Sequence, residues 1–116
     1  MSDTLLYLSG GLGVVISIAH GYLGQTKVVR PVVASTAAAK RVLGAIMFLS
    51  AVYWFAASAL LLATPNYVPE AARTVIVYGA AAVFLSGCLG NLWATRGRHF
   101  GWMLLVLATV LAIAGA

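Results

Sequence analysis

The chain has 116 residues, of which 63% are hydrophobic and only 8% are charged, and its formal net charge is +5. A soluble domain carries roughly 25% charged residues, and a domain this small cannot bury so much apolar surface away from water. The composition therefore predicts a single domain in a lipid bilayer, and basic residues placed between apolar segments argue against nucleic-acid binding.

The first predicted span runs from about Thr4 to Gly24, a length that covers one hydrocarbon thickness. Small residues recur every four positions along it, which lets membrane helices approach closely. They are Ser9, Gly13, Ser17 and Gly21. We expect this helix to end at Gly24 in a left-handed cap, with Pro31 preventing an immediate restart.

The second predicted span covers about Lys40 to Ala63, with Ser35 or Thr36 as its candidate N-cap. Trp54 lies near the middle of this span, although tryptophan usually prefers the membrane boundary. Packing against neighbouring helices explains that position, and a cofactor contact is the alternative. The segment from Pro65 to Pro69 is typical of a tight turn.

The third predicted span runs from about Pro69 to Ala94, and the fourth from about His99 to Ala116. A second face of small residues lies on the third span, formed by Ala82, Ser86 and Gly90. The only cysteine, Cys88, lies in the same apolar run, so we expect it to be a buried small side chain. The predicted fold is thus all-α, an integral membrane bundle of four transmembrane helices.

The basic residues indicate how this bundle is oriented. Six of them fall in the first and third loops, where we expect them to contact lipid headgroups: Lys27, Arg30, Lys40, Arg41, Arg96 and Arg98. The opposite side carries only Arg73, accompanied by Asp3 and Glu70. The positive-inside rule then places both chain ends outside and predicts a multi-pass protein of a bacterial inner membrane.

Two histidines are the candidate functional groups, because an ionisable residue inside a membrane span is rare. His20 lies about one turn from the cytoplasmic end of the first span, and His99 begins the fourth span on the same side. They could respond to protons or ligate haem or a metal. Alternatively His20 binds a carbonyl or a polar neighbour such as Gln25 or Asn91. Without nearby carboxylates the pair is a poor metal site, so we predict neither a metal nor a cofactor.

A polar layer is expected on the cytoplasmic side, formed by His20, Tyr22, Gln25, Asn91 and His99. Such a layer could set the register of the helices, and a quinone or lipid-headgroup site is the alternative.

Catalysis finds little support in the sequence. The serines of the spans have no acid nearby to complete a triad, and the two carboxylates, Asp3 and Glu70, are expected to be external and separate. The sequence therefore predicts a protein that is not an enzyme.

Two resemblances carry some information. His20, Leu23, Gly24 and Gln25, followed by Arg30-Pro31, resemble a His-x-x-Leu-Gly-Glu motif that closes the first span of small bacterial four-span inner-membrane proteins. Gln25 replaces the usual acid, and the resemblance implies location and topology only. The length and four spans also look like the small multidrug resistance transporters, which depend on a glutamate in their first helix. No acid occurs between Thr4 and Gly24, so only the architecture is carried over.

These observations favour a non-enzymatic accessory component that forms a homo-oligomer or joins a larger membrane complex through its faces of small residues. A small-solute transporter or channel that works as an oligomer is the alternative. A third hypothesis is a redox accessory subunit that holds haem or quinone near His20 and His99.

Overall fold

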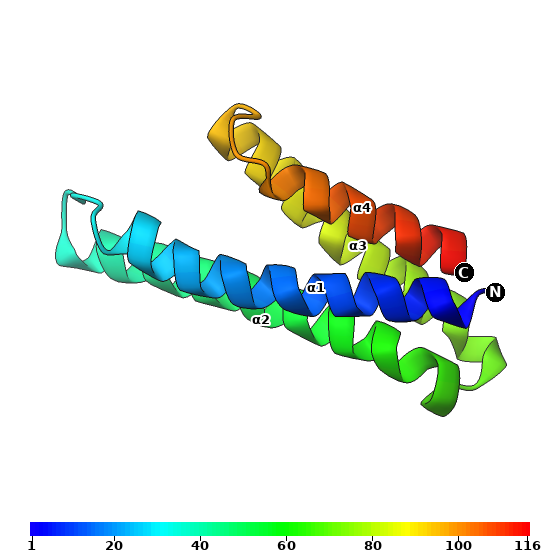
Figure 1. Ribbon diagram of the computed structural model, residues 1–116. Helices are drawn as coiled ribbons and strands as arrows, with labels where there is room; N and C mark the ends of the chain where they lie inside the picture. Colours follow the sequence, from blue (N-terminus) through cyan, green and yellow to red (C-terminus); the bar gives the residue numbers. More distant parts are fainter.

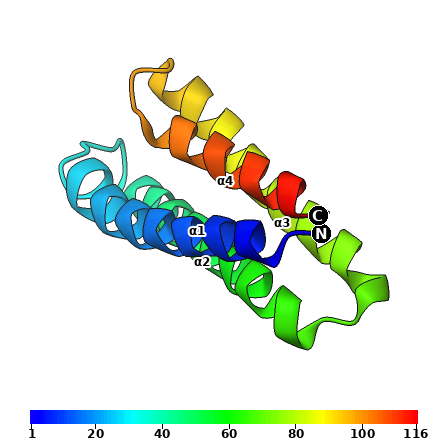
Figure 2. The same cartoon turned by 45° about the vertical axis from the view of Figure 1, so that its right-hand side comes forward.

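The computed structural model describes residues 1–116 and contains four α-helices and no strand (Figure 1). The helices are α1 (Asp3–Leu23), α2 (Ala37–Tyr67), α3 (Glu70–Thr95) and α4 (Gly101–Gly115), and a π-helical segment, η1 (Gly24–Val29), directly follows α1. The all-α prediction is confirmed. Figures 1 and 2 show two hairpins, α1–α2 and α3–α4, which lie together near the chain ends and diverge toward their far loops.

Three helical segments are long and apolar enough to cross a membrane: Asp3–Val29, Ala37–Tyr67 and Glu70–Thr95. The fourth expected span, 99–116, is shorter than predicted. Its helix α4 has 15 residues and covers about 22 Å, against the roughly 30 Å of a hydrocarbon core. The α3–α4 hairpin therefore ends closer to the chain termini than the α1–α2 hairpin does (Figure 1).

The first helix does not end at Gly24, which differs from the sequence prediction. Gly24 has helical backbone angles, φ −59° and ψ −47°, and the chain continues as η1 until Arg30. Two contacts with α2 explain the extension. A side chain at Gly24 would collide with Met47 (2.5 Å to its Cε), and the Gln25 amide donates to the Gly44 carbonyl at 2.9 Å. The helix stops only just before Pro31.

Local signals set the start of α2 but not its end. Thr36 is the N-cap, and its hydroxyl accepts a hydrogen bond from the Ala39 amide at 3.0 Å. The helix then runs through Pro65 to Tyr67, so the turn predicted for Pro65–Pro69 begins later than expected. Proline lacks an N–H, yet within the last turn of a helix it leaves only one carbonyl without its usual donor.

Helix α3 begins and ends within one residue of the prediction. Pro69 precedes its first residue, and Arg96 closes it in the left-handed conformation (φ 52°), followed by Gly97 at φ 73°. These two residues turn the chain sharply into the loop that leads to α4.

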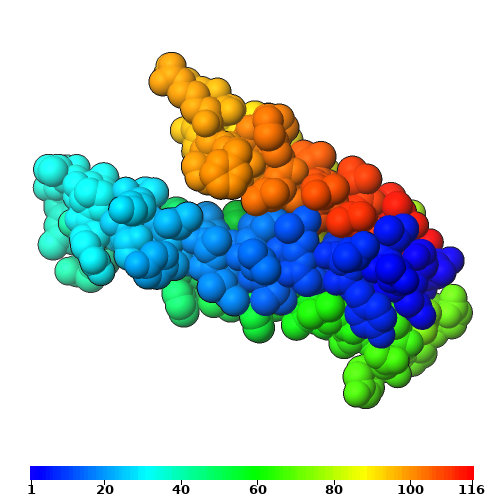
Figure 3. Space-filling model, viewed as in Figure 1, coloured from blue at the N-terminus to red at the C-terminus, as the bar shows by residue number.

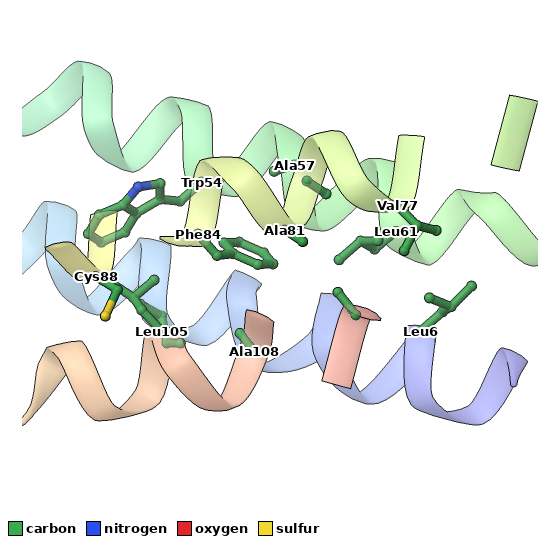
Figure 4. Packing of buried hydrophobic residues seen from close by; sticks show 13 residues of the cluster. Leu6, Trp54, Ala57, Leu61, Val77, Ala81, Phe84, Cys88, Leu105 and Ala108 are labelled. Atoms are coloured by element: carbon green, nitrogen blue, oxygen red, sulfur yellow. The ribbon is translucent and has the colours of Figure 1, made fainter. Parts of the chain in front are cut away.

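The core is an apolar cluster formed by all four helices, with Leu6, Leu61, Phe84 and Leu105 among its most buried side chains (Figure 4). Cys88 belongs to this cluster and is buried, as its apolar surroundings in the sequence predict.

Two hydrogen bonds align α1 with α4. The Ser9 hydroxyl donates to the Ala108 carbonyl at 2.7 Å, and the Ser2 amide donates to the Gly115 carbonyl at 3.0 Å. Both bonds belong to one antiparallel register of the two segments. This register fixes which residues of α1 lie level with the start of α4.

Candidate functional site

His20 lies between α1 and α2, hydrogen-bonded to a residue that the sequence analysis missed. Its Nε2 is 2.8 Å from the Ser50 hydroxyl, and the Ser50 proton is directed to the Met47 carbonyl at 2.9 Å. With Nε2 protonated, His20 donates to the Ser50 hydroxyl while Ser50 donates to the Met47 carbonyl, and in the other neutral tautomer Nε2 accepts from Ser50. Either way, the His20–Ser50 bond joins α1 to α2.

Trp54 packs against this histidine. The two rings lie with their centroids 4.2 Å apart and their planes tilted by 43°. Trp54 is only 6% exposed, and it packs tightly on α3, where a Cβ at Gly87 would lie 2.6 Å from the indole Cε2. Its central position therefore reflects packing between helices, the first of the two interpretations of the sequence.

Asn91 lies one turn beyond Gly87 on α3. Its Oδ1 atom is buried and has no hydrogen-bond partner in the chain. Its Nδ2 lies 3.5 Å from the position that a Cβ of Gly101 would occupy, so the side chain faces the start of α4. A buried carbonyl oxygen without a donor lowers the stability of the fold by about 1–3 kcal/mol, so the Asn91 side chain is destabilising where it lies.

His99 is exposed in the loop before α4 and is engaged locally. Its Nδ1 accepts a hydrogen bond from the Gly101 amide at 3.1 Å, and its ring stacks on Phe100 with centroids 5.0 Å apart. In the neutral state its Nε2 is therefore a free donor. No hydrogen bond joins His99 to His20, and no cluster of three or more His, Cys, Asp or Glu side chains suited to a metal ion occurs.

The remaining residues of the predicted polar layer also form local contacts. Gln25 binds the Gly44 carbonyl, and Tyr22 is exposed, its carbonyl accepting the Thr26 hydroxyl at 2.8 Å. The five side chains of the layer form no hydrogen bonds to one another. The bonds of His20 and Gln25 hold α1 and η1 to α2, whereas Asn91 and His99 belong to the other hairpin.

His20 lies on the α1–α2 hairpin, and Asn91 and His99 lie on the α3–α4 hairpin. Continuing the α1–α4 register beyond Ser9 and Ala108 brings His20 level with the loop Arg96–His99. Figure 3 shows the outer end of this loop, in orange, standing clear of the η1 end, in cyan.

Six basic residues lie in or next to the loops of the two hairpins. Arg96 and Arg98 are exposed, and neither side chain has a hydrogen-bond or ion-pair partner in the chain. At the other hairpin, Lys27, Arg30 and Arg41 are also exposed, and Lys40 donates to the Arg30 carbonyl at 2.9 Å.

The opposite end of the bundle is organised by Arg73, another residue whose role the sequence analysis missed. Its guanidinium lies 3.7 Å from Asp3 and 3.5 Å from Glu70, and it donates to the Pro65 carbonyl at 2.8 Å. The sequence analysis expected these two carboxylates to be separate, and this was wrong. Both converge on Arg73. Arg73 joins the start of α1, the end of α2 and the start of α3.

The two faces of small residues have different surroundings. On α1, Ser9, Gly13 and Ser17 are buried inside the bundle, and a Cβ at Gly21 would contact Ala51 at 3.3 Å. On α3, the residues Ala82, Ser86 and Gly90 are all exposed. A Cβ at Gly90 would meet no atom within 4 Å, and the same holds for Gly79 on this face.

An apolar groove of about 350 Å³ lies beside this α3 face, between α2 and α3. Tyr53 and Leu60 line it from α2, and Val75, Gly79 and Val83 line it from α3. The α1 face of small residues is therefore occupied within the chain, whereas the α3 face is open on the outside.

Comparison with protein-family models, curated proteins and solved structures finds no match for this chain.

Proposed function

We propose that this protein is a multi-pass protein of a bacterial inner membrane and acts as a non-enzymatic packing component. It associates with a second copy of itself, or with a larger membrane complex, through the outer face of α3. The observation that carries this proposal is the open α3 face, on which Gly79 and Gly90 have no neighbour. With Ala82 and Ser86, these glycines form one exposed surface, the α3 face.

Membrane insertion is supported by the outer surface of the helices. Three segments have the length and composition of spans, and large apolar side chains such as Val15, Val75 and Leu89 point outward. Soluble proteins rarely expose apolar surfaces this large to water, because their hydration is unfavourable. Contact with lipid tails removes that cost.

The distribution of charge supports an orientation with both chain ends outside. Six basic residues lie in or next to the two loops at one end, and the seventh, Arg73, is paired with acids at the other. The Ser2–Gly115 hydrogen bond holds the two ends of the chain at the same end of the bundle. The positive-inside rule then assigns the basic loops to the cytoplasm.

Association through the α3 face follows from the forces that act in lipid. Lipid tails are as apolar as leucine, so helices associate through close packing of small residues and not through apolar bulk. The α1 face already serves this purpose inside the chain, against α2, α3 and α4. The α3 face offers the same surface to a partner, and the neighbouring groove provides a recess for its side chains.

The test is self-association of the purified protein in lipid bilayers, measured by energy transfer between donor- and acceptor-labelled copies at several protein-to-lipid ratios. We expect transfer for the wild type and a loss of at least about tenfold in association for the double variant Gly79→Leu and Gly90→Leu, because leucine keeps two backbones apart.

Gly11→Leu is the matched control, since a Cβ at Gly11 would also meet no atom within 4 Å, but on a different helix. This variant should associate like the wild type. A strict monomer in bilayers that also copurifies with no partner from native membranes would contradict the proposal.

A further inference from the structure

The two hairpins share an apolar core only in the half of the bundle that holds the chain ends, the terminal half. Along α1 the buried cluster reaches no further than Ile16, and along the other hairpin it reaches Cys88 and Leu105. In the remaining half, the loop half, Val29 is buried but lies outside the cluster, and it packs inside its own hairpin against Gly44. No core therefore joins the two hairpins in the loop half.

The polar contacts follow the same division. Every hydrogen bond or ion pair between the hairpins lies in the terminal half, from the bond of Ser9 to the contacts of Arg73. In the loop half, the bonds of His20 and Gln25 stay within the first hairpin, and the bond of the Trp102 indole stays within the second. Each hairpin is thus bonded internally in its loop half, whereas no bond joins the two loop halves.

The tips of both hairpins are positively charged, at η1 with the start of α2 and at the loop 96–100. The only carboxylate side chains, Asp3 and Glu70, lie at the other end beside Arg73. Exposed like charges repel weakly in water, but here all pairs between the tips act in the same direction. Four cations belong to the first hairpin and two to the second: Lys27, Arg30, Lys40, Arg41, Arg96 and Arg98.

We propose that the two hairpins are rigid arms that pivot about the terminal half, so that their loop halves open and close. The like charge of the tips favours the open form, in which the hairpins diverge as in Figures 1 and 2. Between α2 and α3 only Val68 and Pro69 belong to no helix. Hinges are often a few residues of this kind at the ends of helices, where backbone angles absorb a rotation. The motion takes place within one chain and does not depend on association through the α3 face.

The experiment measures distances between pairs of spin labels by double electron–electron resonance, with one full-length Cys88→Ala chain per lipid nanodisc. Val28→Cys with Trp93→Cys places one label on each tip and keeps every charge, and Leu60→Cys with Val110→Cys labels both hairpins in the terminal half. All four side chains are exposed in the wild type. We expect a broad distance distribution for the tip pair and a narrow one for the terminal pair.

Salt and charge variants test the role of repulsion. Raising the salt concentration from about 0.01 M to about 1 M shortens the Debye length from about 30 Å to about 3 Å. The mean distance of the tip pair should then fall by at least about 2 Å, the size of helix shifts in switching proteins. The terminal pair should not change.

Two variants of the exposed arginines change the sign of this effect. Arg96→Gln with Arg98→Gln should shorten the tip distance at low salt and weaken its response to salt. Arg96→Glu with Arg98→Glu should reverse the response, because opposite charges attract each other until salt screens them.

Four results would overturn the proposal. A tip pair with a distribution as narrow as that of the terminal pair would show one rigid bundle. A wild-type tip distance that is constant or longer at high salt would exclude repulsion as the cause of the open form. An unchanged salt response in the glutamate variant would do the same. Equal shifts in both pairs would show that salt acts on the whole bundle and not on the arms.

Discussion

Trp54 of α2 lies so close to Gly87 of α3 that a Cβ on the glycine would come within 2.6 Å of the indole Cε2. The indole is 6% exposed and also contacts the His20 ring at a centroid distance of 4.2 Å. This contact holds the two hairpins together at the point where they begin to diverge.

Gly87→Ala is therefore expected to destabilise the bundle by about 1–3 kcal/mol, the usual cost of adding a methyl group to a tightly packed core. The measurement is the free energy of unfolding in mixed micelles, followed by circular dichroism. Gly11→Ala is the control, because its Cβ would meet no atom within 4 Å and alanine favours the helix. If both changes destabilised the protein equally, the methyl group added at Gly87 would not be colliding with Trp54.

Arg73→Gln should destabilise the end of the bundle that holds the chain termini. The change removes the pairs to Asp3 and Glu70 and the hydrogen bond to the Pro65 carbonyl, on a side chain only 18% exposed. We expect a loss of about 1–3 kcal/mol in the free energy of unfolding. Glu70→Gln affects a carboxylate that is 82% exposed and should cost less than about 1 kcal/mol. A larger effect for Glu70 than for Arg73 would contradict this assignment.

Ser50→Ala should weaken the contact between α1 and α2. It removes the hydrogen-bond partner of His20 Nε2, and hydrogen bonds between membrane helices contribute about 0.6 kcal/mol on average and up to about 1.7 kcal/mol. Unfolding measurements should therefore detect a loss within this range. Thr26→Val removes only a bond to the Tyr22 carbonyl one turn earlier in the same helical segment and should leave stability unchanged. Identical stabilities of the two variants would show that the His20–Ser50 bond adds nothing.

The orientation can be tested with single cysteines in a Cys88→Ala background. Tyr67 lies at the turn between α2 and α3 and is 83% exposed, and Lys27 lies on η1 at the other end. A membrane-impermeant maleimide should label Tyr67→Cys in intact cells and Lys27→Cys only after the membrane is opened. The reverse pattern would place the basic loops outside.

Local signals in the sequence predicted the helices but not the contacts between them. Hydropathy located the apolar segments, and the Thr36 cap and Pro69 marked two helix starts, because each depends on a few neighbouring residues. The end of α1 was predicted wrongly, since Gly24 as an isolated residue favours a cap, while its contact with Met47 on α2 keeps it helical.

The sequence predicted which residues are candidates for a functional site, but not which partners they contact. His20, Asn91 and His99 were singled out as polar residues in apolar surroundings, but Ser50 has no such signal, because serines are common in membrane helices. Which face of small residues is buried also depends on the register between helices. That register is set by pairs far apart in the chain, such as Ser9 with Ala108.

The hydrogen bond between the Ser2 amide and the Gly115 carbonyl means that the two ends of the chain are neighbours in space. A short linker could join them, and new ends could be opened in the stretch 32–35 between η1 and α2, which belongs to no helix. Such a circular permutant would keep every helix–helix contact of the bundle while moving both termini to the opposite end of the molecule.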